Sequence, residues 1–575
     1  MVINMSFMKN SKIAEFLYEI ADLLDLKGVQ FKPRAYRRAA QNIDTLSEDI
    51  ASYYEKDKIQ DIPGVGESIA SKVKEIIETG KLEYLDELRQ EFPDGLRKLM
   101  EIQGLGPKTL LKLNKKLDVS SLEELKEAAK SGKIRDLEGF GKKSEQNIIE
   151  NINMYEKFQG RHILGYILPI AEDIEKRLKD RDEVIKVRLA GSIRRMKETI
   201  GDVDILVISK DPGKVMDFFV NMEEVKKVVS KGNTRSTIIA ENNLQVDLRV
   251  VDEGSFGSAL QYFTGSKEHN IQVRQIALDK NYKLSEYGLM DKEKNEKIAG
   301  EKEKEIYRKL GLEYVVPELR ENRGEIEAAL ENDLPDLVEL DDIKGDLHVH
   351  TKWSEGSHTI EEMVKMAQKL GYDYLAICDH AKTLQIAQGL EDDDLKDQIE
   401  KINNLNENYD DFVILKGIEA NIDSDGNLDV SNDLLEQLDF VVASVHSGFK
   451  QSKEKMTNRI IKAIENEHVN AIGHPTGRML NERESYDLDL VKVFEAAVEN
   501  NVFMEINSFP ERLDLSDINC KTAKEHKVKL VINTDSHSRD HMRYMKLGVA
   551  TARRGWLEKS NIVNCLSLKD LQKLL

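Results

Sequence analysis

The 575-residue sequence predicts a multidomain protein of mixed α+β and α/β class. The first part repeats a G-x-G turn followed by a helix, and the middle part alternates strands with helices. The last part has a regular βα rhythm with seven apolar strand segments. We therefore expect helical N-terminal domains, a mixed centre and a C-terminal barrel of seven βα units.

Three helical segments near the N-terminus share one pattern, an apolar residue, G-x-G and then a helix. They are IPGVGESIASKVKEI from Ile62, IQGLGPKTLLKL from Ile102 and LEGFGKKSEQNI from Leu137. Glycine permits the tight turn, and the helix N-terminus offers free N–H groups to a phosphate. A single copy indicates only a capped helix, whereas two clean copies and a weaker third favour helix–hairpin–helix motifs that bind a DNA backbone. The expected DNA-binding glycines are Gly64, Gly66, Gly104, Gly106, Gly139 and Gly141.

The central segment KVRLAGSIRRMKETIGDVDILVIS carries two aspartates on one predicted strand. Asp202 and Asp204 share a face because residues i and i+2 of a strand point the same way. Asp247, in the later strand LQVDLRVV, can face the same spot. Three carboxylates on rigid strands suit Mg²⁺. Two such ions, roughly 3.5–4 Å apart, can activate an attacking hydroxyl and stabilise a leaving pyrophosphate.

An isolated D-x-D would more simply end a surface strand. Gly191 and Ser192 precede it, however, and can lay N–H groups and a hydroxyl against a triphosphate. Arg194 and Arg195 can oppose the phosphate charge. Together these residues favour nucleotidyl transfer.

Two further segments separate this strand pair from the βα repeats. Residues 256–316 contain the run YFTGS and a mixed-charge helical stretch. Residues 317–342 are acidic and are expected to form a linker or a bridging helix.

Six of the seven strand segments beyond residue 343 end in a metal-capable residue, and the first loop adds a glutamate. The C-terminal ends of parallel strands open onto one mouth of a barrel, so these side chains should converge. The nine expected ligands are His348, His350, Glu355, His380, Glu419, His446, His474, Asp535 and His537.

Nine ligands are too many for one ion and suit three. Imidazole mixed with carboxylate favours Mn²⁺, Zn²⁺ or Fe²⁺ over Mg²⁺. One buried histidine alone would be better explained as a core hydrogen-bonding residue, but a set in register with the strand ends predicts a phosphoester-hydrolysing centre. The histidines away from the strand ends are expected at the surface, namely His358, His468, His526 and His541.

The bulk composition limits the class of protein. The net charge of −20 argues weakly against a general nucleic-acid coat, and ten of the twelve histidines lie beyond residue 340. No apolar run approaches the ~20 residues of a membrane span, and the three cysteines form no metal spacing. We expect a reduced, cytoplasmic protein that does not engage a membrane.

With these motifs, nearly the whole chain resembles a bacterial or archaeal family X DNA polymerase with a C-terminal PHP (polymerase and histidinol phosphatase) domain. The resemblance implies a nucleotidyltransferase palm, a small thumb and a distorted (β/α)7 PHP barrel. The implied domains are a lyase-like helical domain (1–85), a fingers-type helical domain (86–158), the palm (159–255), the thumb (256–316), a linker (317–342) and the PHP domain (343–575).

The resemblance also assigns roles to single residues. Asp202, Asp204 and Asp247 bind catalytic Mg²⁺, and Asp247 is also the base or activator for the primer 3′-hydroxyl. The implied contacts to the triphosphate, sugar and nascent base pair are Gly191, Ser192, Arg195, Arg161, Tyr262, Phe263, Gly265, Asn270 and Arg274. Core packing would also account for the two aromatic residues.

Two positions depart from the family pattern. Lys72 lies where a catalytic lysine forms a Schiff base with an abasic sugar, and Lys32 and Tyr36 match nearby positions. Ser68, however, replaces a second lysine, so Lys72 can equally be read as a DNA-phosphate contact. In the barrel, Glu355 stands where an aspartate is usual, and a longer carboxylate can still be a ligand.

The implied activity is DNA polymerisation that fills short gaps in base excision repair. The barrel would add a Mn²⁺-dependent 3′→5′ exonuclease that also removes 3′-phosphates or cleaves at abasic sites. The expected partners are gapped or nicked DNA and dNTPs, bound by a monomer. Two alternatives remain, a template-independent nucleotidyltransferase such as an RNA end-adder, and a DNA-binding scaffold whose PHP barrel is only structural.

Overall fold

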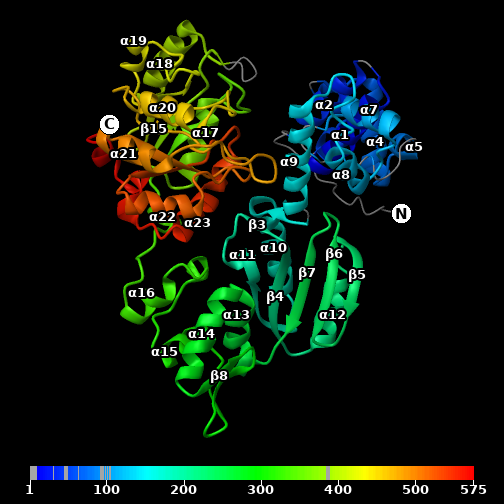
Figure 1. Cartoon of the computed structure of the whole chain (residues 1–575), viewed down its shortest axis with the longest axis vertical. Coiled ribbons are helices and arrows are strands. Elements are labelled where there is room, and N and C mark those ends of the chain that lie inside the picture. Colours follow the sequence, from blue (N-terminus) through cyan, green and yellow to red (C-terminus); the bar gives the residue numbers. More distant parts are fainter. Residues whose placement is uncertain are drawn as a thin grey trace. The chain divides into compact units, whose positions relative to one another are not determined.

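The computed structural model describes residues 10–29, 31–44, 50–62, 64–90, 96, 99, 102, 105–158, 160–383 and 389–575. The chain forms two compact units, residues 1–159 (unit 1) and 160–575 (unit 2). Figure 1 shows the helices of unit 1 in blue to cyan, followed by the sheets and helices of unit 2. None of the helices described is both long and apolar enough to cross a membrane.

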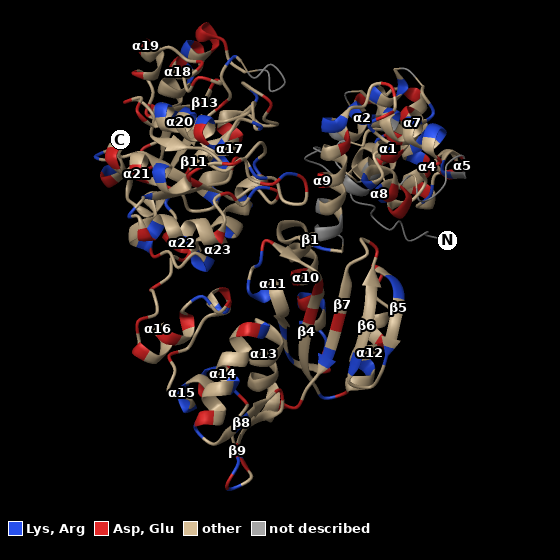
Figure 2. Cartoon of the chain, in the orientation of Figure 1, with Lys and Arg blue, Asp and Glu red and all other residues tan. Residues whose placement is uncertain are grey.

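Unit 1 is helical in its described residues. Its elements are α1 (Asn10–Leu26), α2 (Lys32–Asp44), α3 (Ile50–Glu55), η1 (Ile59–Asp61), α4 (Glu67–Thr79), α5 (Glu83–Gln90), α7 (Pro107–Leu117), α8 (Leu122–Lys130) and α9 (Lys142–Phe158). Apolar residues on one face of each helix form a single core that includes Leu17, Ile43 and Leu113. Figure 2 shows both Lys and Arg and Asp and Glu spread over these helices, so the charge is mixed.

Unit 2 begins with a five-stranded sheet, called here the central sheet, in the order β2-β4-β7-β6-β5. The elements of this region are β1 (His162–Ile163), α10 (Leu164–Lys179), β2 (Val184–Ala190), α11 (Gly191–Arg194), β3 (Thr199–Ile200), β4 (Asp202–Ser209), α12 (Pro212–Val220), β5 (Val225–Lys231), β6 (Arg235–Ala240) and β7 (Gln245–Val250). Only β4 and β7 are parallel neighbours in this sheet.

Strand β4 is apolar on both faces because both faces of the central sheet are covered. Val203, Ile205 and Val207 belong to the core cluster that includes helices α10 and α12. Leu206 and Ile208 belong to a second cluster with α13 (Phe256–Thr264). Since side chains alternate along a strand, Asp202 and Asp204 share the α13 face with Leu206 and Ile208.

A small three-stranded antiparallel sheet follows, in the order β10-β9-β8. The elements after α13 are α14 (Lys267–Asp279), β8 (Tyr282–Ser285), β9 (Gly288–Asp291), β10 (Glu296–Ala299), α15 (Glu303–Lys309), η4 (Pro317–Leu319), α16 (Glu325–Glu331) and η5 (Leu340–Asp342); η3 (Glu253–Ser255) precedes α13. Besides the helices expected over 256–316, this range contains three short strands, β8 to β10.

The acidic segment 317–342 packs against this region. Leu319, Ile326 and Ala329 are buried in the same core as Val273 of α14. Arg320 and Glu325, both charged, are also fully buried. The segment therefore has a hydrophobic inner side beneath its acidic surface.

The remainder of unit 2 is a nearly closed barrel of seven parallel strands in sequence order, β11 to β17. A parallel bridge between Val349 and Ser536 brings the first and last strands together. Its elements are β11 (Gly345–Val349), α17 (Ile360–Lys369), β12 (Tyr374–Ile377), α18 (Asp392–Asn406), β13 (Val413–Asn421), α19 (Asn432–Leu435), β14 (Phe440–Ser444), α20 (Lys453–Ile464), β15 (Ala471–Ile472), α21 (Leu490–Asn500), β16 (Phe503–Asn507), α22 (Asp517–Glu525), β17 (Leu530–Asn533), η7 (His541–Tyr544), α23 (Met545–Arg554), η8 (Lys559–Asn561), η9 (Val563–Cys565) and α24 (Leu568–Leu571).

The strands of the barrel are buried on both sides, as parallel strands covered by helices must be. One core cluster holds Leu347, Phe440 and Val531 together with Leu571 of the C-terminal tail. A larger cluster joins the strands to the surrounding helices. The predicted fold class, a helical N-terminal region followed by mixed α/β parts and a seven-strand barrel, is confirmed.

Candidate metal centres

The three predicted palm aspartates lie on neighbouring strands. Asp202 and Asp204 are on β4, and Asp204 is directly opposite Asp247 of the parallel strand β7. Gly191, the first residue of α11, has a φ of +69°, and a Cβ there would lie 3.0 Å from Oδ2 of Asp204. Glycine is therefore required both for the backbone conformation and for the close approach of this carboxylate.

The electrostatics of this group favour a bound cation. Burial raises the pKa of Asp204 to about 6, with further contributions from the charges of Asp202 and Asp247. Burial and Asp247 also raise the pKa of Asp202. Burial would raise the pKa of Asp247 too, but hydrogen bonds from Thr237, Gln245 and Arg235 lower it overall. Oxygen donors that repel one another when ionised fit Mg²⁺, which would relieve that repulsion.

The arginines near this group are hydrogen-bonded within the protein. Arg161 donates through Nε to Thr199 Oγ1 at 3.0 Å and through Nη2 to Thr199 O at 2.6 Å. Arg194 is ion-paired with Glu303, its Nη2 lying 2.8 Å from Oε2. Arg195 donates through Nε to Glu321 Oε1 at 3.0 Å. The structure thus places Arg194, which we expected to oppose phosphate, on a buried carboxylate. Ser192 lies in α11, next to Gly191.

The YFTGS run ends helix α13 and leads into α14. Tyr262 and Phe263 pack edge to face, with ring centroids 5.2 Å apart. Gly265 caps the helix with a φ of +70°. Asn270 donates through Nδ2 to Tyr262 O at 2.7 Å, and Arg274 donates through Nε to Asn270 O at 3.2 Å. These five predicted nucleotide contacts therefore form one connected group on the α13 side of the sheet.

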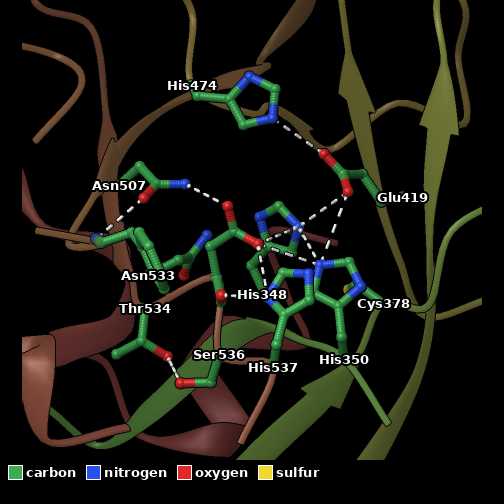
Figure 3. A network of polar contacts seen from close by, with 12 residues as sticks. His348, His350, Cys378, Glu419, His474, Asn507, Asn533, Thr534, Ser536 and His537 are labelled. Carbon is green, nitrogen blue, oxygen red and sulfur yellow. Dashed lines mark hydrogen bonds and ion pairs between the residues drawn. The ribbon is translucent and has the colours of Figure 1, made fainter. Parts of the chain in front are cut away.

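All nine predicted barrel ligands converge at the C-terminal ends of the strands. Apart from His474, they form three overlapping sets, and within each set one potential ligand atom per residue lies within 4.8 Å of the others. The sets are His350, Glu355, His380 and His537; His348, His350 and Asp535; and His380, Glu419 and His446. His474 joins them, with Nε2 3.1 Å from Glu419 Oε1. Figure 3 shows His348, His350, Glu419, His474 and His537 pointing toward a common centre.

The nitrogen and oxygen atoms of this cluster are arranged to bind metal ions and not to satisfy one another's hydrogen bonds. Nε2 of His348 and Nε2 of His350 are only 3.1 Å apart, and Asp535 Oδ1 is 3.1 Å from the latter. Nδ1 of His446, Nδ1 of His474 and Oε2 of Glu355 are buried and have no hydrogen-bond partner among the described residues. Buried polar atoms are rarely left unpaired. A set of imidazoles and carboxylates in this state suits several divalent ions.

The charges within the cluster shift the pKa values of two neighbouring histidines in opposite directions. Burial would lower the pKa of His348, but Glu505, Glu419 and Asp535 raise it well above its usual range. Burial and the neighbouring His537 and His380 lower the pKa of His350 to about 4. The neutral form of an imidazole is the one that binds a metal.

Several buried residues beneath the ligands were not predicted. Glu505 of β16 accepts a hydrogen bond from His348 Nδ1 at 2.7 Å and one from the backbone N of His474 at 2.6 Å. Asp379 accepts hydrogen bonds from Thr351 N at 2.7 Å and Ser354 Oγ at 2.6 Å. The sequence offered a signal for Glu505 only, as the acidic residue inside the one strand segment that lacks a terminal ligand.

One of the four histidines expected at the surface is buried instead. His358 is buried, at 8% exposure, and its Nδ1 accepts a hydrogen bond from Arg539 N at 3.5 Å. It lies in the loop between β11 and α17, where Lys352 N donates to His358 O. His468, His526 and His541 are partly exposed.

In unit 1, the G-x-G turns precede helices as predicted. Gly66 and Gly106 are the N-caps of α4 and α7. Gly64 and Gly139 have φ values of +80° and +81°. Gly141 immediately precedes α9, and Gly104 lies outside the described residues.

Lys72 lies in helix α4. Its Nζ is 3.3 Å from Ser68 Oγ and 4.7 Å from the centre of the Tyr84 ring. Burial lowers the pKa of Lys72, and the nearby charge of Lys32 lowers it further, although Glu75 opposes this. Tyr36 is buried, and burial raises its pKa to about 12.

Comparison with protein families identifies four regions. A helix-hairpin-helix domain matches residues 8–82, and a SAM-like helix-hairpin-helix tandem matches residues 96–153. The DNA polymerase beta thumb matches residues 259–321, and the PHP domain matches residues 346–509.

Similarities to individual proteins agree with these family matches. The chain is 40% identical to the DNA polymerase/3′-5′ exonuclease PolX of Bacillus subtilis over 571 residues, 99% of either chain. It is 27% identical to DNA polymerase lambda of Rattus norvegicus over 340 residues, 54% of this chain and 56% of that protein. A probable phosphatase of Thermoanaerobacter sp. is 38% identical over 203 residues, 33% of this chain and 78% of the phosphatase. The chain therefore belongs to the family X DNA polymerases that carry helix-hairpin-helix, thumb and C-terminal PHP domains.

Proposed function

We propose that this chain is a DNA polymerase that fills short gaps in damaged DNA and a 3′→5′ exonuclease that trims or cleans 3′ ends. The observation that carries the proposal is the presence of two separate sets of metal-capable side chains in unit 2, one on β4 and β7 and one at the barrel mouth. The full-length similarity to a PolX enzyme supports both activities.

At the central sheet, Asp202, Asp204 and Asp247 would hold two Mg²⁺ ions. Such ions supply activation of the primer 3′-hydroxyl and stabilisation of the leaving pyrophosphate. Asp247 is held by Thr237, whose Oγ1 donates to its Oδ1 at 2.6 Å, and by Gln245, whose Nε2 donates to its Oδ2 at 2.8 Å, so its carboxylate keeps a fixed orientation.

The nucleotide would lie between α11 and α13. Ser192, Arg195 and Arg161 would bind the triphosphate, Gly191 lets the backbone approach, and Tyr262 with Phe263 would line the sugar. Asn270 and Arg274 would contact the nascent base pair. The hydrogen bonds that join Asn270 to Tyr262 and Arg274 to Asn270 would fix the positions of these side chains before the nucleotide binds.

At the barrel, nine ligands would hold three ions, for which Mn²⁺ is the proposed choice and Zn²⁺ or Fe²⁺ the alternatives. Ions in such a cluster supply a nucleophile for phosphodiester hydrolysis at neutral pH. Glu505 orients His348, and six of the nine proposed ligands are buried, all but Glu355, His446 and His537. The same site would remove 3′-phosphates or cleave at abasic positions.

The two activities should be separable by mutation. Asp202→Ala should abolish dNTP incorporation on a one-nucleotide gap with Mg²⁺ and leave Mn²⁺-dependent 3′ trimming intact. His380→Ala should do the reverse. Asp182→Ala and His468→Ala serve as controls, because Asp182 is exposed and His468 lies outside the ligand cluster. Loss of both activities in Asp202→Ala would contradict two independent centres.

The same assay decides between the alternatives. A template-independent nucleotidyltransferase would extend single-stranded RNA as readily as a gapped duplex. A scaffold with a structural barrel would show no trimming in any metal. The helix-hairpin-helix regions support a DNA substrate instead.

We also propose that Lys72 acts on abasic sugars, because its lowered pKa increases the neutral amine that Schiff-base formation needs. Borohydride should trap the chain on DNA with a 5′ abasic sugar, and Lys72→Ala should lose the adduct. Lys74→Ala is the control, since Lys74 is on the same helix but pairs with Asp57. An adduct of equal yield in Lys72→Ala would reduce Lys72 to a phosphate contact.

The remaining proposals concern the setting. We propose the domain boundaries predicted from the sequence, and gapped or nicked DNA and dNTPs as the partners. Three buried free cysteines are consistent with a reducing compartment, so we place a monomeric enzyme in the cytoplasm.

A further inference from the structure

The barrel contacts the central sheet at the segment that carries the proposed triphosphate ligands. Arg554, the last residue of α23, is 4% exposed. Its Nη1 donates to the main-chain O of Arg195 at 2.7 Å and to Glu321 Oε1 at 3.1 Å, and its Nη2 donates to Asp517 Oδ2 at 2.7 Å. One buried side chain of the barrel thus contacts both Arg195 and a carboxylate that Arg195 itself binds.

Glu321 is shared between the two arginines. Its Oε1 accepts from Arg195 Nε at 3.0 Å as well as from Arg554. Burial would raise the pKa of Glu321, but Arg554, Arg195 and Lys197 lower it overall, so the carboxylate is ionised. Arg195 is therefore held at its main chain by Arg554 and at its guanidinium by a carboxylate that Arg554 fixes in place.

A second barrel loop contacts the same region. Arg478 Nη2 lies 2.8 Å from Glu198 Oε2, three residues after Arg195. Asn481 Nδ2 donates to the main-chain O of Arg161 at 3.3 Å. The main-chain oxygens of both proposed triphosphate-binding arginines therefore accept hydrogen bonds from side chains of the barrel.

The surrounding packing makes this a fixed contact. Leu480, Leu513 and Leu547, all from the barrel, are buried in the core cluster of the central sheet. A Cβ on Gly165 of α10 would lie 2.7 Å from Pro510 Cβ. A closely packed apolar interface of this kind transmits small displacements instead of absorbing them.

We propose that Arg554 is a positioning residue for nucleotide incorporation, through which the barrel sets the place of Arg195 and hence the affinity for the incoming dNTP. This inference rests on the proposed polymerase function. The role is separate from hydrolysis at the barrel mouth, because Arg554 bonds Arg195, Glu321 and Asp517 and none of the nine ligands.

Arg554→Gln should raise the dNTP KM about tenfold, because a buried charged hydrogen-bond donor to Arg195 and Glu321 is lost. The kcat should change much less, since Asp202, Asp204 and Asp247 are untouched. Mn²⁺-dependent 3′ trimming by the same preparation should be unchanged, which shows that the barrel is folded. Arg554→Lys, which keeps the charge but not both Nη bonds, should give an intermediate KM.

Arg553 provides a matched control on the same helix. Its Nε donates to Glu318 Oε1 at 2.9 Å and its Nη1 to Glu339 Oε1 at 2.6 Å, so it ties α23 to segment 317–342 without contacting Arg195. Arg553→Gln should keep the parental dNTP KM. An equal rise in both variants would overturn the specific role of Arg554, because any weakening of the interface would then suffice.

The binding of dNTP is also measured directly, as the rise in unfolding temperature that dNTP and Mg²⁺ produce. Equal dNTP affinities in the parent, Arg554→Gln and Arg554→Lys would overturn the positioning role, even if one variant were poorly folded. Failure of the parent to incorporate dNTPs would instead overturn the proposed function, so the two failures are distinguishable.

Discussion

Among the three aspartates of the central sheet, Asp204 is the one whose ionised form the folded protein disfavours most. Its pKa of about 6, against an ordinary 3.8, means that the folded state holds the proton more tightly than the unfolded chain does. Ionisation therefore destabilises the fold progressively as the pH rises from 3.8 to about 6, and the cost is complete above that range. It amounts to at most about 3 kcal/mol.

Asp204→Asn should consequently unfold at a higher temperature than the parent in chelator, with a larger gain at pH 8 than at pH 5. Mg²⁺ should narrow the difference, because the cation stabilises the parental carboxylates. Differential scanning calorimetry measures both effects. Asp182→Asn, an exposed aspartate before β2, should show no such dependence. A gain that is the same at both pH values would mean that charge repulsion at Asp204 is not the cause.

The sequence allowed us to predict metal-capable residues that recur at regular positions relative to the strands. Eight of the nine proposed barrel ligands follow strand ends and Glu355 lies in the first loop, while Asp202 and Asp204 alternate on β4 opposite Asp247 of β7, so their positions relative to the strands were visible in the sequence. Asp379 gave no such signal, because an acidic residue next to His380 could equally have been the ligand. The partners of Arg194 were hidden for another reason, since Glu303 is 109 residues away.

At the scale of elements, β16 differs from the other six barrel strands because it supplies support instead of a ligand. Its Glu505 is fully buried and accepts hydrogen bonds from His348 Nδ1 and, at 3.0 Å, from Asn533 Nδ2. A carboxylate behind a ligating histidine fixes the ring and raises its basicity. β16 therefore orients His348, a proposed metal ligand on β11.

Glu505→Gln should weaken metal binding at the barrel by about 10- to 100-fold, since the amide keeps the shape but loses the charge that orients His348. Metal titration by calorimetry and Mn²⁺-dependent trimming measure the loss, and incorporation on gapped DNA should be unaffected. Glu499→Gln, exposed on α21, is the control. Unchanged metal affinity would show that His348 is oriented by its other neighbours.

The barrel strands were predictable as elements because each is a short apolar run buried on both faces. The β8–β10 sheet was not, because its strands have only four residues each, too few for an alternating pattern to stand out. Segment 317–342 was expected to be a linker or a bridging helix, and it contains the helix α16. Its acidic composition hid Leu319, Ile326 and Ala329, which are the residues that pack.

For the whole molecule, the sequence could predict which parts exist but not how the barrel and the central sheet share a core. Leu480, Leu513 and Leu547 lie in barrel loops and a barrel helix where a leucine carries no periodic signal. Complementary shape between segments hundreds of residues apart leaves no local pattern. The close approach of Gly165 to Pro510 is an example.

This shared core predicts which fragments of the chain will fold. A fragment of residues 160–575 keeps every member of the core that surrounds α10 and β4, whereas a fragment ending at residue 342 removes Leu480, Leu513 and Leu547 from it. Each buried leucine lost in this way costs about 1.5 kcal/mol or more, and the exposed apolar surface favours aggregation. The 160–575 fragment should therefore unfold cooperatively and retain Mn²⁺-dependent 3′ trimming, while the 1–342 fragment should aggregate or melt at a much lower temperature. Size-exclusion chromatography and calorimetry of both fragments provide the measurement, and a stable, monomeric 1–342 fragment would show that the central sheet does not need the barrel.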